Sequence, residues 1–342
     1  MKIITLGSTN IQTAQNAFGA LPIQRVSMDE GIRILRKAYQ GGMRFFDTAR
    51  AYSDSEEKLG KAFCDIPREE IYIATKTMAK TPDEFWKQLN TSLELLKTDY
   101  IDIYQFHCAA QVYKPNDGTG MYECMLEAKR QGKIRHIGIT AHLLQVAFDA
   151  VESGLYETLQ FPLSYLSTEK EIELVKRCQE KNMGYIAMKG LAGGLIHESE
   201  KAMAFMTQFD NVLPIWGIQK ESELDEWLSY METTPTMNDD IQAYIEKEKK
   251  ELSGDFCRGC GYCMPCPVGI QINQCARMSL MLRRSPSKAW LTPQMQEEMK
   301  KIENCLHCGQ CHQKCPYNLD IPTLLQKNYE DYQKVLSGEV KV

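Results

Sequence analysis

Two hydrophobic rhythms alternate along most of the chain. Short runs of β-branched and aromatic residues are each followed by a longer stretch in which apolar residues recur every three or four positions, as in buried strands followed by amphipathic helices. The predicted strands are residues 16–20, 43–47, 71–76, 101–106, 134–139, 157–161, 184–188 and 212–217. The predicted helices are residues 28–40, 55–64, 82–97, 119–132, 143–153, 168–182, 198–208 and 221–231. A short hairpin is predicted before them, around residues 7–10.

This alternation predicts an α/β fold, and the number of strand-helix units matches a (β/α)8 TIM barrel. A doubly wound open sheet is the alternative. Polar residues decide between the two, because Asp47, Lys76 and His107 stand at the ends of three successive predicted strands. Barrel enzymes assemble their sites from several strand ends, whereas an open sheet would spread these residues along an edge. We therefore predict a barrel over residues 1–235.

The cysteines separate a second domain from the barrel. Of the 13 cysteines, nine fall between residues 257 and 315, directly after a highly charged stretch at 237–252. That stretch predicts a helix with a solvated face and contains the domain boundary. We predict a helical linker and a small, mainly helical domain over residues 236–342, with its helices within 272–283, 293–302 and 320–336.

Composition narrows the class of partner. Hydrophobic residues make up 43% of the chain, which excludes disorder as its main state, and a net charge of -5 gives no electrostatic reason to bind nucleic acid or an anionic membrane. No apolar run approaches the roughly 20 residues of a membrane span, and the first residues lack the pattern of a signal peptide. We expect a cytoplasmic protein that acts on a small molecule. In a reducing compartment, clustered cysteines predict metal binding rather than disulfides.

The cysteines of the second domain form two runs, each ending in Cys-Pro. The first run contains Cys257, Cys260, Cys263 and Cys266, and the second contains Cys305, Cys308, Cys311 and Cys315. The second has the CxxCxxCxxxCP spacing of bacterial ferredoxins, in which the fourth cysteine binds the other cluster. We predict one [4Fe-4S] cluster on Cys257, Cys260, Cys263 and Cys315, and another on Cys305, Cys308, Cys311 and Cys266. Four thiolates also satisfy zinc, which stays the alternative, and Cys275 is predicted to be a packed thiol.

Four residues of the barrel fit the chemistry of carbonyl reduction. Such a reaction needs a hydride at carbon and a proton at oxygen, and Tyr52 could supply the proton if a positive charge stabilises its phenolate. Lys76 provides that charge, Asp47 keeps the lysine charged and oriented, and His107 positions the substrate oxygen. Each residue alone also has an ordinary structural reading. The set of four, in these strand contexts, predicts a catalytic site.

Residues 1–235 resemble the aldo/keto reductase family. The resemblance rests on Phe46-Asp47-Thr48-Ala49, Thr75-Lys76, Gln105-Phe106-His107 and the stretch 132–140. It implies that Asp47, Tyr52, Lys76 and His107 are catalytic and that NADPH or NADH supplies the hydride. The cysteine-rich domain resembles the ferredoxin domain that some aldo/keto reductase-like proteins carry.

The resemblance also implies positions for the dinucleotide. A glycine-rich turn at 188–194 would hold its pyrophosphate, and Lys220 would meet a 2'-phosphate. The implied contacts are Gly19, Ala20, Thr140, Gln160, Met188, Lys189, Gly190, Leu191, Gly193, Gly217, Lys220 and Asp225. Three positions depart from the family pattern. Thr140-Ala141 replaces a Ser-Asn pair, Met188 replaces a tyrosine that stacks on the nicotinamide, and Glu223 replaces a phosphate-binding arginine and favours NADH by repulsion.

Three functional hypotheses follow. The first is an NAD(P)H-dependent reductase of carbonyls, or dehydrogenase of alcohols, that carries two [4Fe-4S] clusters. A hydride carries two electrons and a cluster one, so direct exchange would need a flavin or a radical intermediate, and a flavin is a further candidate cofactor. The second is a ferredoxin-linked reductase, in which a ferredoxin or flavin partner supplies electrons through the clusters and the barrel binds substrate or the partner. The third has the clusters as structural staples or redox sensors.

Overall fold

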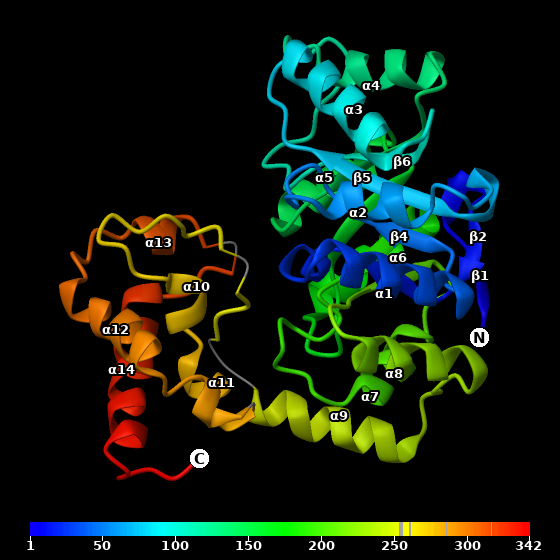
Figure 1. Cartoon of the computed structure of the whole chain (residues 1–342). Coiled ribbons are helices and arrows are strands. Elements are labelled where there is room, and N and C mark those ends of the chain that lie inside the picture. Colours follow the sequence, from blue (N-terminus) through cyan, green and yellow to red (C-terminus); the bar gives the residue numbers. More distant parts are fainter. Residues whose placement is uncertain (253–255, 260, 285, 316) are drawn as a thin grey trace. The chain divides into compact units, whose positions relative to one another are not determined.

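The computed structural model describes residues 1–252, 256–259, 261–284, 286–315 and 317–342 (Figure 1). The chain divides into two compact units. The first comprises Met1–Gly190 and Ser199–Gln242, and the second comprises Leu191–Glu198 and Ala243–Val342. The segment Leu191–Glu198, which follows the seventh strand of the barrel, thus belongs to the second unit, and the predicted boundary at residue 235 stays a prediction.

The first unit is a closed barrel of eight parallel strands in the order β10-β3-β4-β5-β6-β7-β8-β9. The strands are β3 (Ala17–Gly19), β4 (Phe45–Asp47), β5 (Tyr72–Thr77), β6 (Ile101–Phe106), β7 (Ile134–Thr140), β8 (Thr158–Pro162), β9 (Gly184–Met188) and β10 (Val212–Gly217). Each lies within two residues of its predicted bounds at either end. The (β/α)8 TIM barrel is therefore confirmed and the open sheet is wrong.

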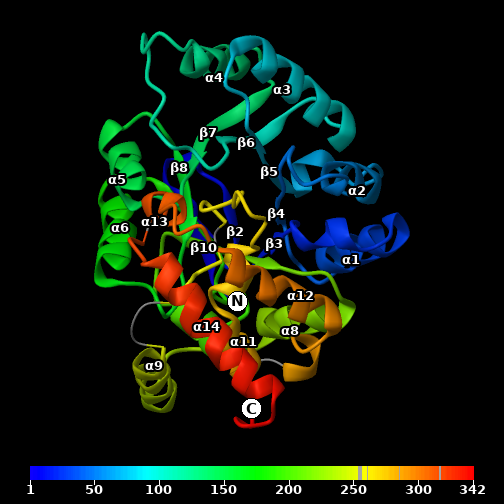
Figure 2. The same ribbon diagram turned by 90° about the vertical axis from the view of Figure 1, so that its left-hand side faces the viewer.

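Helices surround the barrel, and α1 to α6 are seen outside the strands in Figure 2. They are α1 (Met28–Gln40), α2 (Ser55–Ala62), α3 (Pro82–Leu96), α4 (Met121–Arg130), α5 (Leu144–Ser153), α6 (Glu169–Glu180), α7 (Ser199–Met206) and α8 (Glu221–Glu232). Local sequence fixes several of their starts. Ser27 caps α1 through the Glu30 amide, and Thr168 and Glu171 form a reciprocal capping box on α6.

The predicted N-terminal hairpin is present as β1 (Ile3–Thr5) paired antiparallel with β2 (Gln12–Ala14). Its side chains Ile4, Leu6 and Ile11 form one buried cluster with residues from the strands of the barrel, among them Phe45 at the start of β4. The hairpin therefore closes the end of the barrel where the strands begin. The opposite rim, at the carboxyl ends of the strands, is left for a site.

The second unit is mainly helical, as predicted. Its helices are α9 (Asp239–Glu251, whose first residues belong to the first unit), α10 (Ile272–Cys275), α11 (Met278–Arg284), α12 (Pro293–Lys300), α13 (Gln310–Gln313) and α14 (Ile321–Leu336). Short 3-10 turns occur in both units. They are η1 (Gly7–Thr9), η2 (Pro22–Arg25) and η3 (Arg68–Glu70) in the first, and η4 (Ser287–Ala289) and η5 (Lys301–Asn304) in the second. Asn328 of α14 accepts a hydrogen bond from the Ser279 amide and donates one to the Ala276 carbonyl, which fixes α14 against α11. Leu195 lies in the core of this unit. None of the helices described is both long and apolar enough to cross a membrane.

Candidate active site and cluster ligands

Three neighbouring strands carry the predicted site to one rim of the barrel. Asp47 is the last residue of β4, Lys76 is next to last in β5, and His107 directly follows β6. In the strand register Asp47 is opposite Ala74, and Lys76 is opposite Gln105. Because the strands are parallel, their carboxyl ends meet at the same rim.

Lys76 and Asp47 form a buried ion pair. The Lys76 Nζ atom lies 2.7 and 2.8 Å from the two carboxylate oxygens of Asp47 and 2.6 Å from the Thr48 carbonyl oxygen. Their side chains are 1% and 3% exposed, so all three ammonium hydrogens are used within the protein. Burial raises the pKa of Asp47, and the charge of Lys76 opposes that rise. The pair holds the lysine in one position beneath Tyr52.

Tyr52 and His107 lie next to this pair. Their rings meet edge to face with centroids 5.6 Å apart, and Lys76 Nζ is 5.3 Å from the centre of the Tyr52 ring. Burial, and then the negative charge of Asp47, raise the pKa of Tyr52, so the phenol keeps its proton. Burial and the Lys76 charge lower the pKa of His107 to about 3, so the imidazole is neutral near pH 7. The structure thus brings a proton donor and a neutral imidazole to one place.

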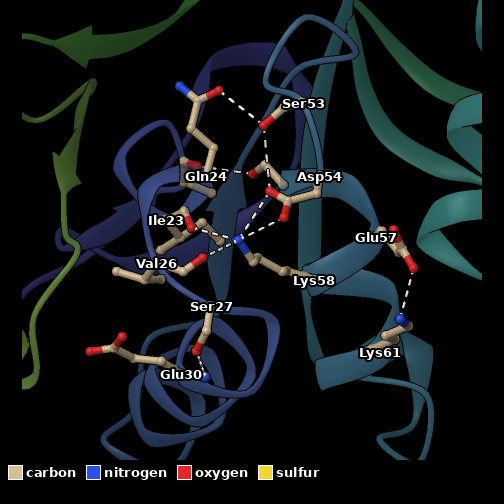
Figure 3. Close-up of polar contacts among 12 residues, drawn as sticks. Ile23, Gln24, Val26, Ser27, Glu30, Ser53, Asp54, Glu57, Lys58 and Lys61 are labelled. Atoms are coloured by element: carbon tan, nitrogen blue, oxygen red, sulfur yellow. Dashed lines mark hydrogen bonds and ion pairs between the residues drawn. The ribbon is translucent and has the colours of Figure 1, made fainter.

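Lys58 anchors the turn that carries Tyr52. Its fully buried ammonium donates to the carbonyls of Ile23 and Val26, each at 2.8 Å, and to the Asp54 carboxylate at 3.0 Å (Figure 3). Asp54 is two residues after Tyr52, so one lysine joins the loop after β3 to the loop after β4. No sequence pattern indicates this role, because a lysine in an amphipathic helix is normally exposed.

The predicted cluster ligands lie in the second unit, except that Cys260 is outside the described residues. Cys263 and Cys266 of the first run line the same pocket as Cys305, Cys308 and Cys311 of the second run. Burial, together with charge on Cys305 and Cys308, raises the pKa of the Cys311 thiol. The grouping brings the two runs together without dividing their cysteines between two clusters, and the crossed ligand set stays a prediction. Within the described ranges, no three cysteine, histidine or acidic side chains lie close enough to hold a single metal ion.

Comparison with known proteins identifies both parts of the chain. The model of the aldo/keto reductase family matches residues 4–212, which is more than half of the chain. The chain belongs to the aldo/keto reductase family, a family of oxidoreductase enzymes. A model of a 4Fe-4S dicluster domain matches residues 256–320.

Named relatives agree with the family. Methylglyoxal reductase DkgB of Salmonella typhi is 36% identical over 171 residues, covering 47% of this chain and 62% of that protein. L-galactose dehydrogenase of Arabidopsis thaliana is 28% identical over 218 residues, covering 58% of this chain and 68% of that protein. An aldo-keto reductase from Bacillus halodurans has the same fold, with a TM-score of 0.64 at 22% identity, covering 72% of this chain and 96% of that structure. The chain thus spans less than two thirds of the methylglyoxal reductase.

Several of the implied dinucleotide positions have contacts of their own in this aldo/keto reductase. The Thr140 hydroxyl accepts the Cys108 amide at 2.7 Å, and Asp225 pairs with Lys37 at 2.6 Å. The Glu223 carboxylate accepts the amides of Gln219 and Lys220 at 2.9 and 3.1 Å. Glu223 therefore serves as a cap of α8, which explains an acidic residue at that position.

Other implied positions lie close to the four predicted catalytic residues, here called the tetrad, or to the barrel strands. The Gln160 amide lies 3.5 Å from Asp47 Oδ1 and 3.9 Å from the Met188 sulfur. Gly19, Ala20 and Gly217 lie at or just after the ends of β3 and β10, where a Cβ on Gly19 would be 3.0 Å from the Trp216 carbonyl oxygen. A Cβ on Gly190 would lie 2.4 Å from the Trp216 ring. Leu191 and Gly193 belong to the second unit. Lys189, which has a positive φ of 59°, belongs to the first.

Sequence reasoning missed His142 and Cys108. Burial, Lys189 and His107 lower the pKa of His142 to about 3, and its Nδ1 lies 4.0 Å from the Cys108 sulfur. These residues add a second neutral imidazole beside the tetrad. The available signal was position, since each stands two residues beyond a strand end.

Proposed function

We propose that the barrel interconverts a small carbonyl compound and its alcohol with NADPH or NADH, and that the second unit holds two [4Fe-4S] clusters. The observation that carries the proposal is the arrangement of Tyr52 and His107 over the buried Lys76–Asp47 pair. A proton donor, a neutral hydrogen-bonding group and a fixed positive charge are the parts that carbonyl reduction requires.

In this mechanism the substrate oxygen lies between Tyr52 and His107. The neutral imidazole of His107 donates a hydrogen bond that orients the carbonyl, and the Tyr52 hydroxyl gives its proton to the oxygen. The bound dinucleotide supplies the hydride to carbon. The ammonium of Lys76, 5.3 Å from the Tyr52 ring centre, stabilises the phenolate that remains until solvent restores its proton.

The residues that would hold the dinucleotide are Thr140, Gln160 and Met188 on the nicotinamide side and the turn from Lys189 on the phosphate side. Glycines in that turn permit close approach of backbone amides to phosphate. The Glu223 carboxylate is held by the amides at the start of α8, so its effect on a 2'-phosphate is limited to charge repulsion. We propose both dinucleotides as candidates.

The methylglyoxal reductase and L-galactose dehydrogenase relatives suggest the first substrates to test, namely methylglyoxal and L-galactose. We propose a cytoplasmic location, in keeping with cysteines held reduced for cluster binding.

A ferredoxin-linked reductase is the second candidate function. It is favoured by the exposure of Leu306, His307 and Cys308, which makes the second cysteine run accessible to a one-electron partner. In that case the clusters supply electrons, a flavin can convert one-electron to two-electron steps, and the tetrad transfers protons. A structural or sensing role for the clusters is the third candidate.

Anaerobically purified protein separates these functions. Binding of NADPH or NADH, followed by reduction of methylglyoxal, is expected for the first function, and the Tyr52→Phe variant should bind dinucleotide normally while losing at least about 100-fold in kcat. Full turnover by that variant contradicts the proposed role of Tyr52. Absence of dinucleotide binding with cluster reduction by a ferredoxin favours the second function, and turnover unchanged after cluster loss favours the third.

A further inference from the structure

Arg277 occupies an unusual position in the second unit, between α10 and α11. Its guanidinium lies against the backbone of two glycines that are far apart in the sequence. A Cβ on Gly193 would be 2.8 Å from the Arg277 Nη1 atom, and a Cβ on Gly259 would be 3.0 Å from the same nitrogen. Both glycines have positive φ angles, +68° and +65°. We call Gly193 and Gly259 the glycine clamp, because a Cβ at either position would crowd the guanidinium and require it to shift.

Two donors of this guanidinium are buried without a hydrogen-bond partner among the described residues, Nε and Nη1. Leaving such donors unpaired in a folded protein costs about 1–3 kcal/mol each, so a partner is expected in the assembled protein. Arginine remains charged in proteins, and the desolvation of that charge adds to the cost. The position therefore calls for an acceptor with negative charge.

Cys257 of the first run lies close to Gly259 of the glycine clamp. Gly259 of the clamp is two residues after Cys257, and its amide lies 3.4 Å from the Cys257 sulfur, as an N–H···S hydrogen bond. Gly259 thus lies against both the Arg277 guanidinium and the sulfur of a predicted cluster ligand.

The two cysteine runs differ in exposure. In the first run Cys257 and Cys263 are buried and Cys266 is half-buried. In the second run Cys311 is buried and Cys305 and Cys315 are half-buried, but Cys308 is exposed and its neighbour Leu306 is 64% exposed. Reduction adds a negative charge to a cluster, so burial alone makes reduction less favourable and would place the buried cluster at the lower potential. An electron that enters at the exposed cluster would then not move inward. A positive charge at the buried cluster opposes this effect, because it favours the added electron.

We propose that Arg277 is a positioning residue that donates hydrogen bonds to the sulfur atoms of the cluster bound by Cys257 and raises that cluster's reduction potential. The inference rests on the proposed presence of two clusters. The step it favours is transfer of one electron from the reduced exposed cluster to the oxidised buried cluster, after a ferredoxin-type donor has reduced the first. No bond is formed or broken and no proton moves.

Redox titration of the anaerobic holoprotein, followed by electron paramagnetic resonance, tests the proposal. In Arg277→Gln one of the two reduction potentials should become more negative while the other stays unchanged. Arg277→Lys should shift the same potential less, because it keeps the charge but loses the planar fork of donors. Each sample is first assayed for iron and sulfide.

The glycine clamp supplies a matched pair of variants that leave Arg277 itself intact. Gly193→Ala should displace the guanidinium and shift the same potential in the same direction. Gly194→Ala is the control, since it lies in the same loop with φ +92° and its Cβ would meet nothing within 4 Å. It should shift neither potential.

Unchanged potentials in both Arg277→Gln and Gly193→Ala, at full iron content, overturn the proposal, as does an equal shift of both clusters. Should Arg277→Gln lose iron, the comparison of Gly193→Ala with Gly194→Ala decides. Wild-type protein without two clusters by iron and spin content refutes the proposed function as well, and is recognised before any variant is compared.

Discussion

The Lys76–Asp47 pair makes the strongest prediction about the barrel. Replacing Asp47 with Asn keeps the shape of the side chain but removes the charge that faces Lys76 Nζ at 2.7 and 2.8 Å. The lysine is 1% exposed and cannot reach water, so a buried ammonium is left with a neutral amide and one carbonyl. Removing one partner of such a pair costs about 3–5 kcal/mol. We expect Asp47→Asn to lower the free energy of unfolding by this amount and to reduce kcat by at least about 100-fold.

Urea unfolding followed by tryptophan fluorescence measures the first effect, because Trp86, Trp216 and Trp227 belong to the barrel. The double variant Asp47→Leu/Lys76→Met removes both charges and should recover most of the stability while remaining inactive. Glu127→Gln, at an exposed ion pair, is the control and should leave the urea midpoint unchanged. The reasoning is refuted if Asp47→Asn is as stable as the wild type, or if the double variant is the least stable of the three.

Three further predictions concern His107, Lys58 and the crossed cluster ligands. The pKa of His107 is about 3 in the folded protein and near 6.5 in the unfolded chain, so the unfolded state binds more protons between these pH values. The free energy of unfolding therefore falls as the pH drops below about 6.5, by up to ~1.4 kcal/mol per pH unit. The urea midpoint of His107→Gln should fall less than that of the wild type between pH 6.5 and pH 5, measured in steps of about half a pH unit. Parallel curves for the two proteins contradict the lowered pKa of His107. Lys58→Met leaves two carbonyls and Asp54 without their donor, and should lower the free energy of unfolding in urea by about 1–3 kcal/mol. Because Lys58 anchors the turn that carries Tyr52, the variant should lower kcat by a larger factor than it changes KM. Unchanged kinetics contradict that role. Cys266→Ala should remove about half of the bound iron, whereas Cys275→Ala should keep all of it, and equal iron contents contradict the ligand assignment.

The strands and helices were predictable because each is encoded locally. The β4 strand is a run of Phe45, Phe46 and Asp47 that pairs on both sides within the barrel, and the capping box of Thr168 and Glu171 marks the start of α6. The strand-end positions of Asp47, Lys76 and His107 follow from the same periodicity, and Tyr52 lies on the turn after β4. Sequence therefore predicts which residues reach the rim, although their distances from one another require the fold.

The remaining features depend on contacts that no local pattern encodes. Glu223 was assigned to the neighbourhood of the adenosine, but a carboxylate that caps a helix looks the same in sequence as one that faces a ligand. Leu191–Glu198 follows a barrel strand in the chain, yet Leu195 is buried in the core of the second unit. Lys58 also escaped notice, since its burial depends on carbonyls of a loop about 30 residues away.

The unequal exposure of the two cysteine runs bears on why an aldo/keto reductase would carry clusters at all. A staple needs ligands and burial, but it does not need an exposed Cys308 in one run, buried Cys257 and Cys263 in the other, and an arginine beside the buried pair. A sensor needs an exposed cluster but no second one at a higher potential. Under the proposal for Arg277, electron transfer is the role that would use both features, because the exposed cluster would receive the electron and the charge of Arg277 would favour the inward step. Because a cluster passes single electrons and carbonyl reduction needs two, this order of potentials would let the second unit hold two electrons, one on each cluster, before any two-electron step.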